Sequence, residues 1–230
     1  MLSTLKTSVK AAFAALFVTA APAAAELELS FYTGWQETNS STISGTLPGG
    51  AAVNRSVSWR GDSFDNPYYY GGRAIWWTQS NWGFGVEGTH AKAYAPAADR
   101  AALGLSRLEL SDGHNIITIN AMKRFPGAIG SSGRWTPYVG GGIGFAMPHV
   151  DAQPLGSPVR TYDFEVTGPA IRGLAGMKYN ITDSWAVFGE YQFTWSDNDL
   201  TIDPAPGQAA GKLSTEIVTH AINIGISYSF

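Results

Sequence analysis

The clearest pattern in the sequence is a strict alternation of side-chain character at the end of the chain. From Val218 to Phe230 the even-numbered positions are apolar except for His220, and the odd-numbered positions carry Thr, Ala, Asn, Gly and Ser. A period of two indicates a β-strand whose two faces meet different environments. The segment 215–230 is therefore predicted to be a strand with one apolar face and one small, polar face.

The same alternation recurs along the chain and yields eight strand candidates. They cover residues 26–36, 68–78, 82–94, 115–125, 136–149, a stretch that ends at 179, 185–195 and 215–230. In the seventh candidate, for example, Tyr191 and Phe193 alternate with Glu190 and Gln192. Each candidate is at least as long as the roughly 9 to 11 residues that a tilted strand needs to cross a bilayer.

The connections between these candidates alternate in length. The segments 79–81, 126–134 and 180–184 are short, whereas the other connections are long and rich in Gly, Pro, Ser and Asp. Short turns on one side and long loops on the other are typical of outer-membrane barrels, and closure of a barrel removes the unpaired strand edges that lipid does not tolerate. The predicted fold is all-β: an eight-stranded antiparallel up-and-down transmembrane β-barrel that comprises residues 26–230.

The face opposite the apolar one is charged and is predicted to line the lumen. Its charged members are Glu28, Arg73, Glu87, Arg172, Lys178 and Glu190. A soluble sandwich or lipocalin-like barrel also alternates, but its apolar face points inward, which would leave these charges and several glycines in solvent. An eight-stranded barrel is just wide enough to be filled by its own side chains. We therefore expect structural ion pairs inside and no pore.

The first 25 residues read as a signal peptide rather than as part of the fold. Lys6 and Lys10 precede a short apolar stretch, which ends at small residues around Ala25. The chain of 230 residues contains no Cys, which argues against a disulfide scaffold and a lipoprotein anchor. Two of the 15 basic residues lie in the signal segment, so 13 basic and 18 acidic residues remain. This acidic balance does not suggest a nucleic-acid partner.

All four histidines lie near the predicted outer ends of strands, at positions 90, 114, 149 and 220. Neutral imidazole is a common ligand of transition metals, and His149 is two residues from Asp151, as Asp112 is from His114. However, alternation points His114 inward and His149 outward, and His90 is two strands from His149, or nearly 10 Å at about 4.8 Å per strand. Ordinary rim histidines that bind headgroups or loops remain the simpler interpretation.

Three basic residues, Lys92, Arg107 and Arg160, also belong to the outer rim or its loops. They indicate either recognition of a phosphorylated lipid or a general electrostatic seal to anionic surface lipid. The sequence has no GxGxxG motif between a strand and a helix, no GxSxG elbow and no HExxH helix. A serine hydrolase, a flavoenzyme and a nicotinamide-dependent enzyme therefore have no support.

Whole segments of the chain resemble the lipid A oxidase family of α-proteobacterial outer membranes. The most specific segments are THAKAYA (89–95) and MPHV (147–150), within matching stretches at 26–36, 82–95, 106–122, 136–150, 174–194 and the last strand. TPYVGGG (136–142) and the last strand also occur in barrels like outer-membrane protein A. The terminal strand ending in Phe230 resembles the insertion signal that the barrel-assembly machinery reads in outer-membrane proteins.

The resemblance implies a function. Members of this family oxidise the proximal glucosamine of lipid A to 2-aminogluconate with molecular oxygen and a divalent metal. On that basis we hypothesise an iron or manganese site made by His90, His149 and Asp151. Lys92 and Arg107 would hold a lipid A phosphate. Glu87 would act as a base or support a ligand, although its inward orientation counts against this role.

The sequence thus predicts a monomeric outer-membrane barrel whose partners are lipid A, the surrounding lipid and the assembly machinery. The competing hypothesis is a non-enzymatic surface barrel that supports envelope integrity or adhesion through its long loops.

Overall fold

The computed structural model describes residues 26–130 and 132–230, so the predicted signal segment 1–25 lies outside the described residues. Within them the structure has a single six-residue helix, α2 (Ala97–Ala102), and 11 strands. The strands are β1 (Glu26–Thr38), β2 (Ser41–Thr46), β3 (Ala52–Val57), β4 (Tyr70–Trp77), β5 (Trp82–Tyr94), β6 (Leu105–Arg124), β7 (Trp135–Pro154), β8 (Thr161–Phe164), β9 (Gly168–Asn180), β10 (Trp185–Ile202) and β11 (Gly211–Ser229). None of the helices that can be described is long and apolar enough to cross a membrane.

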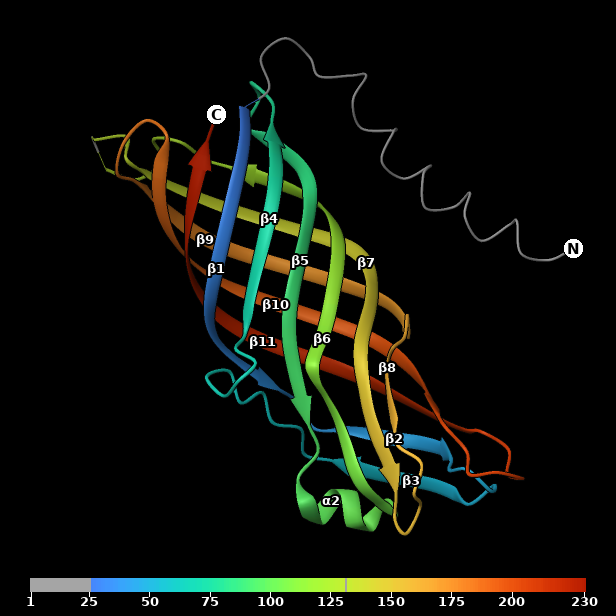
Figure 1. Ribbon diagram of the computed structural model, residues 1–230. Coiled ribbons are helices and arrows are strands. Elements are labelled where there is room, and N and C mark those ends of the chain that lie inside the picture. The colour runs from blue at the N-terminus through green and yellow to red at the C-terminus, as the bar shows by residue number, and fades with distance from the viewer. Residues whose placement is uncertain (1–25, 131) are drawn as a thin grey trace, which may run out of the picture.

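Long antiparallel strands form a closed ring. They follow the order β1, β4, β5, β6, β7, β9, β10 and β11, and β11 pairs back with β1 from Glu28↔Ser229 to Thr38↔Thr219. Figure 1 shows β1, the C-terminus and the tight β4–β5 connection at one end of this ring, and β2, β3 and α2 at the other. The predicted all-β antiparallel barrel is confirmed, but β2, β3 and β8 were not predicted.

The wall of the ring is apolar outside and charged inside. Ile119, Ile143 and Ile224 point outward and are 62, 71 and 67 % exposed, whereas Glu87 and Arg172 point inward and are 1 and 2 % exposed. A soluble protein places these two classes the other way round. The exposed apolar band is the surface that lipid requires, so the predicted orientation of the two faces agrees with the structure.

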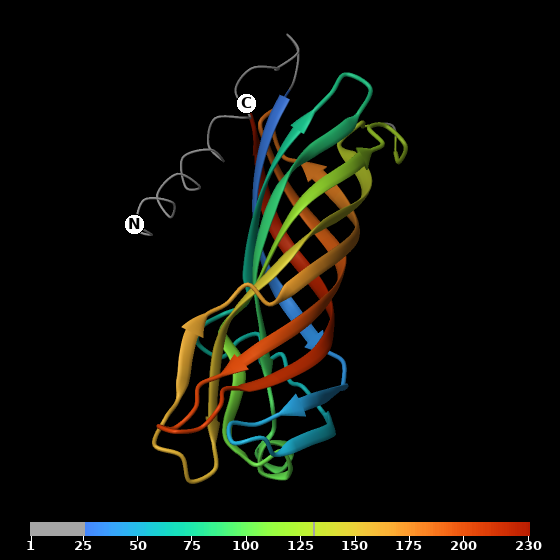
Figure 2. The ribbon, with the colours of Figure 1, turned by 90° about the vertical axis from the view of Figure 1, so that its right-hand side faces the viewer.

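Several strands extend past the apolar band and build a second compartment, which we call the outer head (Figure 2). There β2 pairs with both β11 and β3, and β8 pairs with β7. The helix α2 connects the end of β5 to the start of β6. The interior of the outer head is a buried hydrophobic cluster that includes Ile43, Trp59, Leu108, Leu200 and Ile217. The inside of the molecule therefore changes from polar to apolar where the outside changes from lipid to water.

The strands also run further than the sequence pattern predicted. The predicted segment 115–125 belongs to β6, which begins ten residues earlier, at Leu105, and β10 continues to Ile202. The register of β6 against β7 shifts between Leu105 and Arg107 and again between Glu109 and His114. Each shift breaks the period of two, so the first half of β6 reads as a loop although it is paired.

Candidate functional site

The carboxylate of Glu87 lies at the centre of a buried hydrogen-bond network in the lumen. Oε1 accepts hydrogen bonds from Tyr32 Oη (2.5 Å) and Gln192 Nε2 (2.7 Å), and Oε2 accepts one from Asn120 Nδ2 (2.6 Å). Arg172 Nη1 lies 3.1 Å from Oε1. These partners occupy the carboxylate from all sides, inside the wall and away from any lipid. The position of Glu87 therefore supports a structural role rather than the predicted role as a base.

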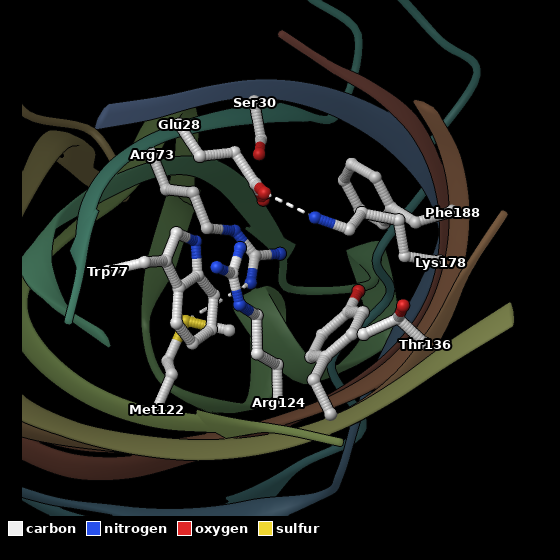
Figure 3. A pocket seen from close by; sticks show the side chains of 10 residues that line it. Glu28, Ser30, Arg73, Trp77, Met122, Arg124, Thr136, Lys178 and Phe188 are labelled. Carbon is white, nitrogen blue, oxygen red and sulfur yellow. Dashed lines mark hydrogen bonds and ion pairs between the residues drawn. The ribbon is translucent and has the colours of Figure 1, made fainter. Parts of the chain in front are cut away.

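The rest of the lumen is filled in the same way. Arg73 forms an ion pair with Glu190, which also accepts a hydrogen bond from Tyr138 Oη at 2.8 Å. Closer to the turns, Lys178 Nζ donates to Glu28 Oε2 at 2.5 Å, and Figure 3 shows this pair beside Arg73 in the pocket at that end. The pocket has only about 10 Å³ of free space, which is about the size of one water molecule. The lumen is a packed core, as predicted, and offers no path to a solute.

Two of the predicted metal ligands, His90 and His149, lie in different environments. His90 stacks on Tyr70 with ring centroids 5.0 Å apart, and its Nδ1 is 3.0 Å from Asn115 Oδ1. His149 lies edge-on to Tyr162 at 4.3 Å. Along the rungs of the sheet His90 pairs with Asn115, and Asn115 pairs with Met147, two residues before His149. The whole width of β6 therefore separates the two rings.

The third predicted ligand, Asp151, is already neutralised. Its Oδ1 accepts a hydrogen bond from Arg160 Nε at 2.6 Å, and its Oδ2 accepts from Arg160 Nη2 at 2.7 Å and from Arg107 Nη1 at 2.8 Å. Among the side chains that the structure describes, which do not include those of residues 111, 112 and 131, no three His, Asp or Glu are grouped so that they could hold a metal ion. The described contacts do not bring His90, His149 and Asp151 together in one group, and the metal site stays a prediction.

The remaining histidines also have local partners. His114 lies inside the barrel, where its Nε2 is 3.2 Å from Asn198 Oδ1 and 3.2 Å from Ser196 Oγ. His220 lies on the outer wall, where its Nδ1 is 2.6 Å from Tyr191 Oη. Both histidines therefore contact side chains of the barrel strands, and His114 is buried rather than exposed at the rim.

Lys92, a predicted phosphate ligand, is fully buried. Its ammonium donates to the backbone oxygen of Asp65 at 2.7 Å and lies over the ring of Tyr94 at 5.3 Å. Burial lowers the pKa of this ammonium, against the opposing effect of the acidic groups of Asp65 and Asp62. The register shift between Ala91 and Ala93 interrupts the alternation at this residue, so counting positions could not reveal its burial. The structure therefore does not present Lys92 to lipid.

Arg107, the other predicted phosphate ligand, is exposed and has a neighbour of the same charge. Its side chain is 43 % exposed, that of Arg160 is 40 % exposed, and both bind Asp151, which is 4 % exposed. The hydrogen bonds from Arg160 to Asp151 raise the pKa of Arg160 further above its usual value. We call Arg107 and Arg160 the arginine pair. Arg107 Nη1 also lies 3.2 Å from Glu109 Oε1, so the arginine pair contacts two carboxylates, and both arginine side chains remain partly exposed.

An apolar stripe leads from the arginine pair towards the lipid band. Arg160 lies over the ring of Tyr162 at 4.2 Å, and the alternate residues Tyr162, Phe164 and Val166 are 53, 54 and 63 % exposed. Thr167 N, the next backbone amide, bonds to Ala146 O at the edge of the exposed apolar wall. We call residues 160, 162, 164 and 166 the β8 stripe. The sequence TYDFEV (161–166) contains the alternation of polar and apolar residues that indicates this stripe. It lies in a stretch that was predicted to be a loop.

Comparison with known proteins supports the same architecture. The family model of the outer membrane protein β-barrel domain matches residues 11–230. The chain belongs to the outer membrane protein β-barrel family. No curated protein sequence matches the chain significantly.

Two solved structures of outer-membrane barrels show the same fold. Neisserial surface protein A is 15 % identical with a TM-score of 0.50, over 89 % of this chain and 97 % of its own. The outer membrane protein OprG from Pseudomonas aeruginosa is 13 % identical with a TM-score of 0.52, over 90 % of this chain and 96 % of its own.

Membership of the outer membrane protein β-barrel family fixes the direction of the barrel. In such barrels the short turns face the periplasm and the long connections face outward. The start of β1 and the end of β11 therefore lie on the periplasmic side, and the outer head, the arginine pair and the β8 stripe lie on the outer side.

Proposed function

We propose that this outer-membrane barrel oxidises lipid A at its proximal glucosamine, as the resemblance to the lipid A oxidase family implies. The observation that carries the proposal beyond sequence resemblance is the β8 stripe. It joins two exposed guanidinium groups to an apolar surface that runs down to the lipid band. A phosphorylated lipid of the outer leaflet has the matching order of groups, with phosphate above acyl chains.

In this proposal the arginine pair binds a lipid A phosphate, and Tyr162 and Phe164 contact the adjoining apolar part of the lipid. Arg160 takes the place that the sequence pattern assigned to Lys92, because Lys92 is buried. The packed lumen supports a reaction at the outer surface, since its own charges fill the interior of the ring.

The resemblance also implies a divalent metal and molecular oxygen. A bound redox metal would supply oxygen activation, but the described histidines and carboxylates do not assemble a site for it. We therefore assign no catalytic step to Glu87, His90, His149 or Asp151. The part of the proposal that this structure supports is the recognition of the lipid.

Mass spectrometry of lipid A from a deletion strain and from complemented strains tests the activity. We expect one added oxygen on the sugar backbone only when the gene is present, and a reduced fraction of oxidised lipid A with Arg107→Gln and Arg160→Gln together. A matched control is Arg60→Gln, because Arg60 is also exposed in the outer head but pairs with Asp62 away from the β8 stripe. Unchanged lipid A in the deletion strain would refute the enzymatic function.

A second candidate function is a non-enzymatic surface barrel that supports envelope integrity. It is favoured by the fact that no metal-holding group occurs among the residues that can be described, and by the complete use of the lumen for ion pairs. This function predicts unchanged lipid A together with increased leakage of periplasmic enzymes in the deletion strain.

We further propose that residues 1–25 direct export and are removed, and that the barrel-assembly machinery recognises the terminal strand. The backbone of Phe230 is paired to Leu27 O at 3.0 Å, so the last residue lies on the β1–β11 seam that closes the ring. Deletion of Phe230 should lower the amount of barrel in the outer membrane, as measured by fractionation.

A further inference from the structure

The lipid-facing wall has an open apolar groove on its periplasmic half that the proposed function does not use. It has a volume of about 530 Å³ and runs across β7, β9, β10 and β11. Its apolar lining includes Trp135, Met177, Val187 and Ile224. The short turns that follow β9 and precede β7 lie at one end of the groove. Because short turns face the periplasm, the groove faces the periplasmic leaflet.

The groove exists because Gly189 takes the place of a large outward side chain. Gly189 lies on one rung of the sheet between Met177 of β9 and Ile224 of β11, and its neighbours on the same face of β10 are Val187 and Tyr191. A Cβ at this glycine would meet only Asn223 O, at 3.9 Å. The position can therefore accept a side chain without strain, and the groove is not forced by crowding of the backbone.

The periplasmic end of the groove is polar and positively charged. Trp135 and Tyr179 pack together there with ring centroids 4.7 Å apart, as interfacial aromatic residues do. Arg134 is exposed, and its Nη1 donates to Tyr179 Oη at 3.5 Å. The groove thus has a guanidinium at the level of the lipid headgroups and an apolar floor at the level of the acyl chains.

We propose that this groove is a specific site for one glycerophospholipid of the periplasmic leaflet. One acyl chain fills the recess over Gly189, and the phosphate binds Arg134 beside Tyr179. The order of charge, aromatic ring and apolar recess matches the order of phosphate, glycerol and acyl chain in such a lipid. Lipid A is not the occupant, because it resides in the opposite leaflet, where the arginine pair lies.

Binding at this site depends on shape rather than on removal from water. The surrounding lipid is as apolar as the groove, so the gain comes from close packing of an acyl chain against the recess and from the ion pair at its end. A larger side chain at Gly189 should therefore displace the chain while it leaves the fold and the outer surface intact.

Native mass spectrometry of the purified barrel, titrated with phosphatidylglycerol in neutral detergent, measures this binding. We expect the wild type to retain one lipid and Gly189→Leu to weaken retention by about tenfold. The matched control is Gly88→Leu. Gly88 also faces outward, on β5, and has open space around it, but it lies outside the groove. Arg134→Gln should weaken retention of phosphatidylglycerol but leave the weak retention of uncharged diacylglycerol unchanged.

Equal retention by the wild type and Gly189→Leu would overturn the proposal, as would equal losses in the Gly189 and Gly88 variants. Folding of each variant is checked by its heat-modifiable migration on gels. If Gly189→Leu fails to fold, Met177→Trp fills the groove from the neighbouring strand and is subject to the same criteria. The readout is independent of lipid A oxidation, so failure of one proposal does not decide the other.

Discussion

The buried charges of the lumen predict a strong energetic coupling between Arg172 and Glu87. Three cations and three carboxylates are buried there and balance one another: Arg73, Arg172 and Lys178 against Glu28, Glu87 and Glu190. Replacement of Arg172 by Met leaves Glu87 with one remaining cation, Arg73, whose Nε is 4.0 Å away. The change therefore leaves an uncompensated negative charge that is buried in the lumen.

The magnitude follows from two opposing effects. Loss of one partner of a buried ion pair costs about 3–5 kcal/mol. Nε and Nη2 of Arg172 have no hydrogen-bond partner, and Met removes these unsatisfied groups, which places the expected loss at the lower end of that range. We therefore expect Arg172→Met to lower the free energy of unfolding by about 3 kcal/mol. Glu87→Gln should cost at least as much, because Arg172 then loses its carboxylate partner.

The double variant should cost clearly less than the two single variants added together. With both charges removed the lumen is neutral again, and a glutamine at position 87 keeps partners in Tyr32, Asn120 and Gln192. We expect a coupling energy of about 2 kcal/mol. Urea unfolding in detergent micelles, followed by the fluorescence of the eight tryptophans, measures it.

An exposed ion pair provides the control for this cycle. Arg60 lies 3.2 Å from Asp62 and its side chain is 60 % exposed, so Arg60→Met should change stability by less than about 1 kcal/mol. Additive effects of Arg172→Met and Glu87→Gln would refute the reasoning, because they would show that the two charges do not neutralise each other in the folded barrel.

Three further predictions concern the wall and the outer head. Gly144→Ala should prevent folding, because a Cβ there would lie 1.8 Å from Ile117 O, whereas Gly88→Ala should fold normally; recovery of the heat-modifiable form tests both. Ile119→Lys should destabilise the barrel by about 2–4 kcal/mol in urea unfolding, because Ile119 lies midway along the lipid-facing part of β6, whereas Asn54→Lys on exposed β3 should have almost no effect. Since burial lowers the pKa of Lys92 in the folded protein, the unfolded chain binds more protons between that lowered pKa and the ordinary value of 10.5, and stability should rise with pH across this window. Lys92→Met should remove this part of the rise, and an unchanged pH profile would contradict the burial of the ammonium.

The membrane-spanning part of the fold could be predicted from the sequence because lipid imposes a simple rule. Outward positions in the band are mostly apolar, so residues such as Ile222, Ile224 and Ile226 repeat with a period of two that is easy to find. Beyond the lipid the outer surface faces water and the interior is apolar, and bulges shift the register. The first half of β6 and the short strands β2 and β3 follow no such rule and were missed. β8 does alternate, but it is only four residues long and lies in a stretch that was predicted to be a loop.

The candidate site was harder to predict because spacing along a strand does not report distances across strands. The inward orientation of Glu87 followed from alternation and is correct, and it places that carboxylate in the lumen network. His149 and Asp151 are close in sequence, but Asp151 is held by two arginines from other parts of the chain. Which side chains neutralise a carboxylate is decided by the partner strands, and no pattern within one strand contains that information.

The two interiors of the molecule together determine where a ligand can bind. Within the membrane the ring is filled by paired charges, and beyond it the outer head is filled by apolar side chains. A ligand therefore has to contact the outside of the wall, where its depth in the bilayer selects it. In our two proposals, the arginine pair and the β8 stripe bind a lipid of the outer leaflet, whereas the groove at Gly189 binds a lipid of the periplasmic leaflet beside Arg134. Because the two leaflets of an outer membrane contain different lipids, the proposals name different partners, and substitutions in one surface should leave binding at the other unchanged.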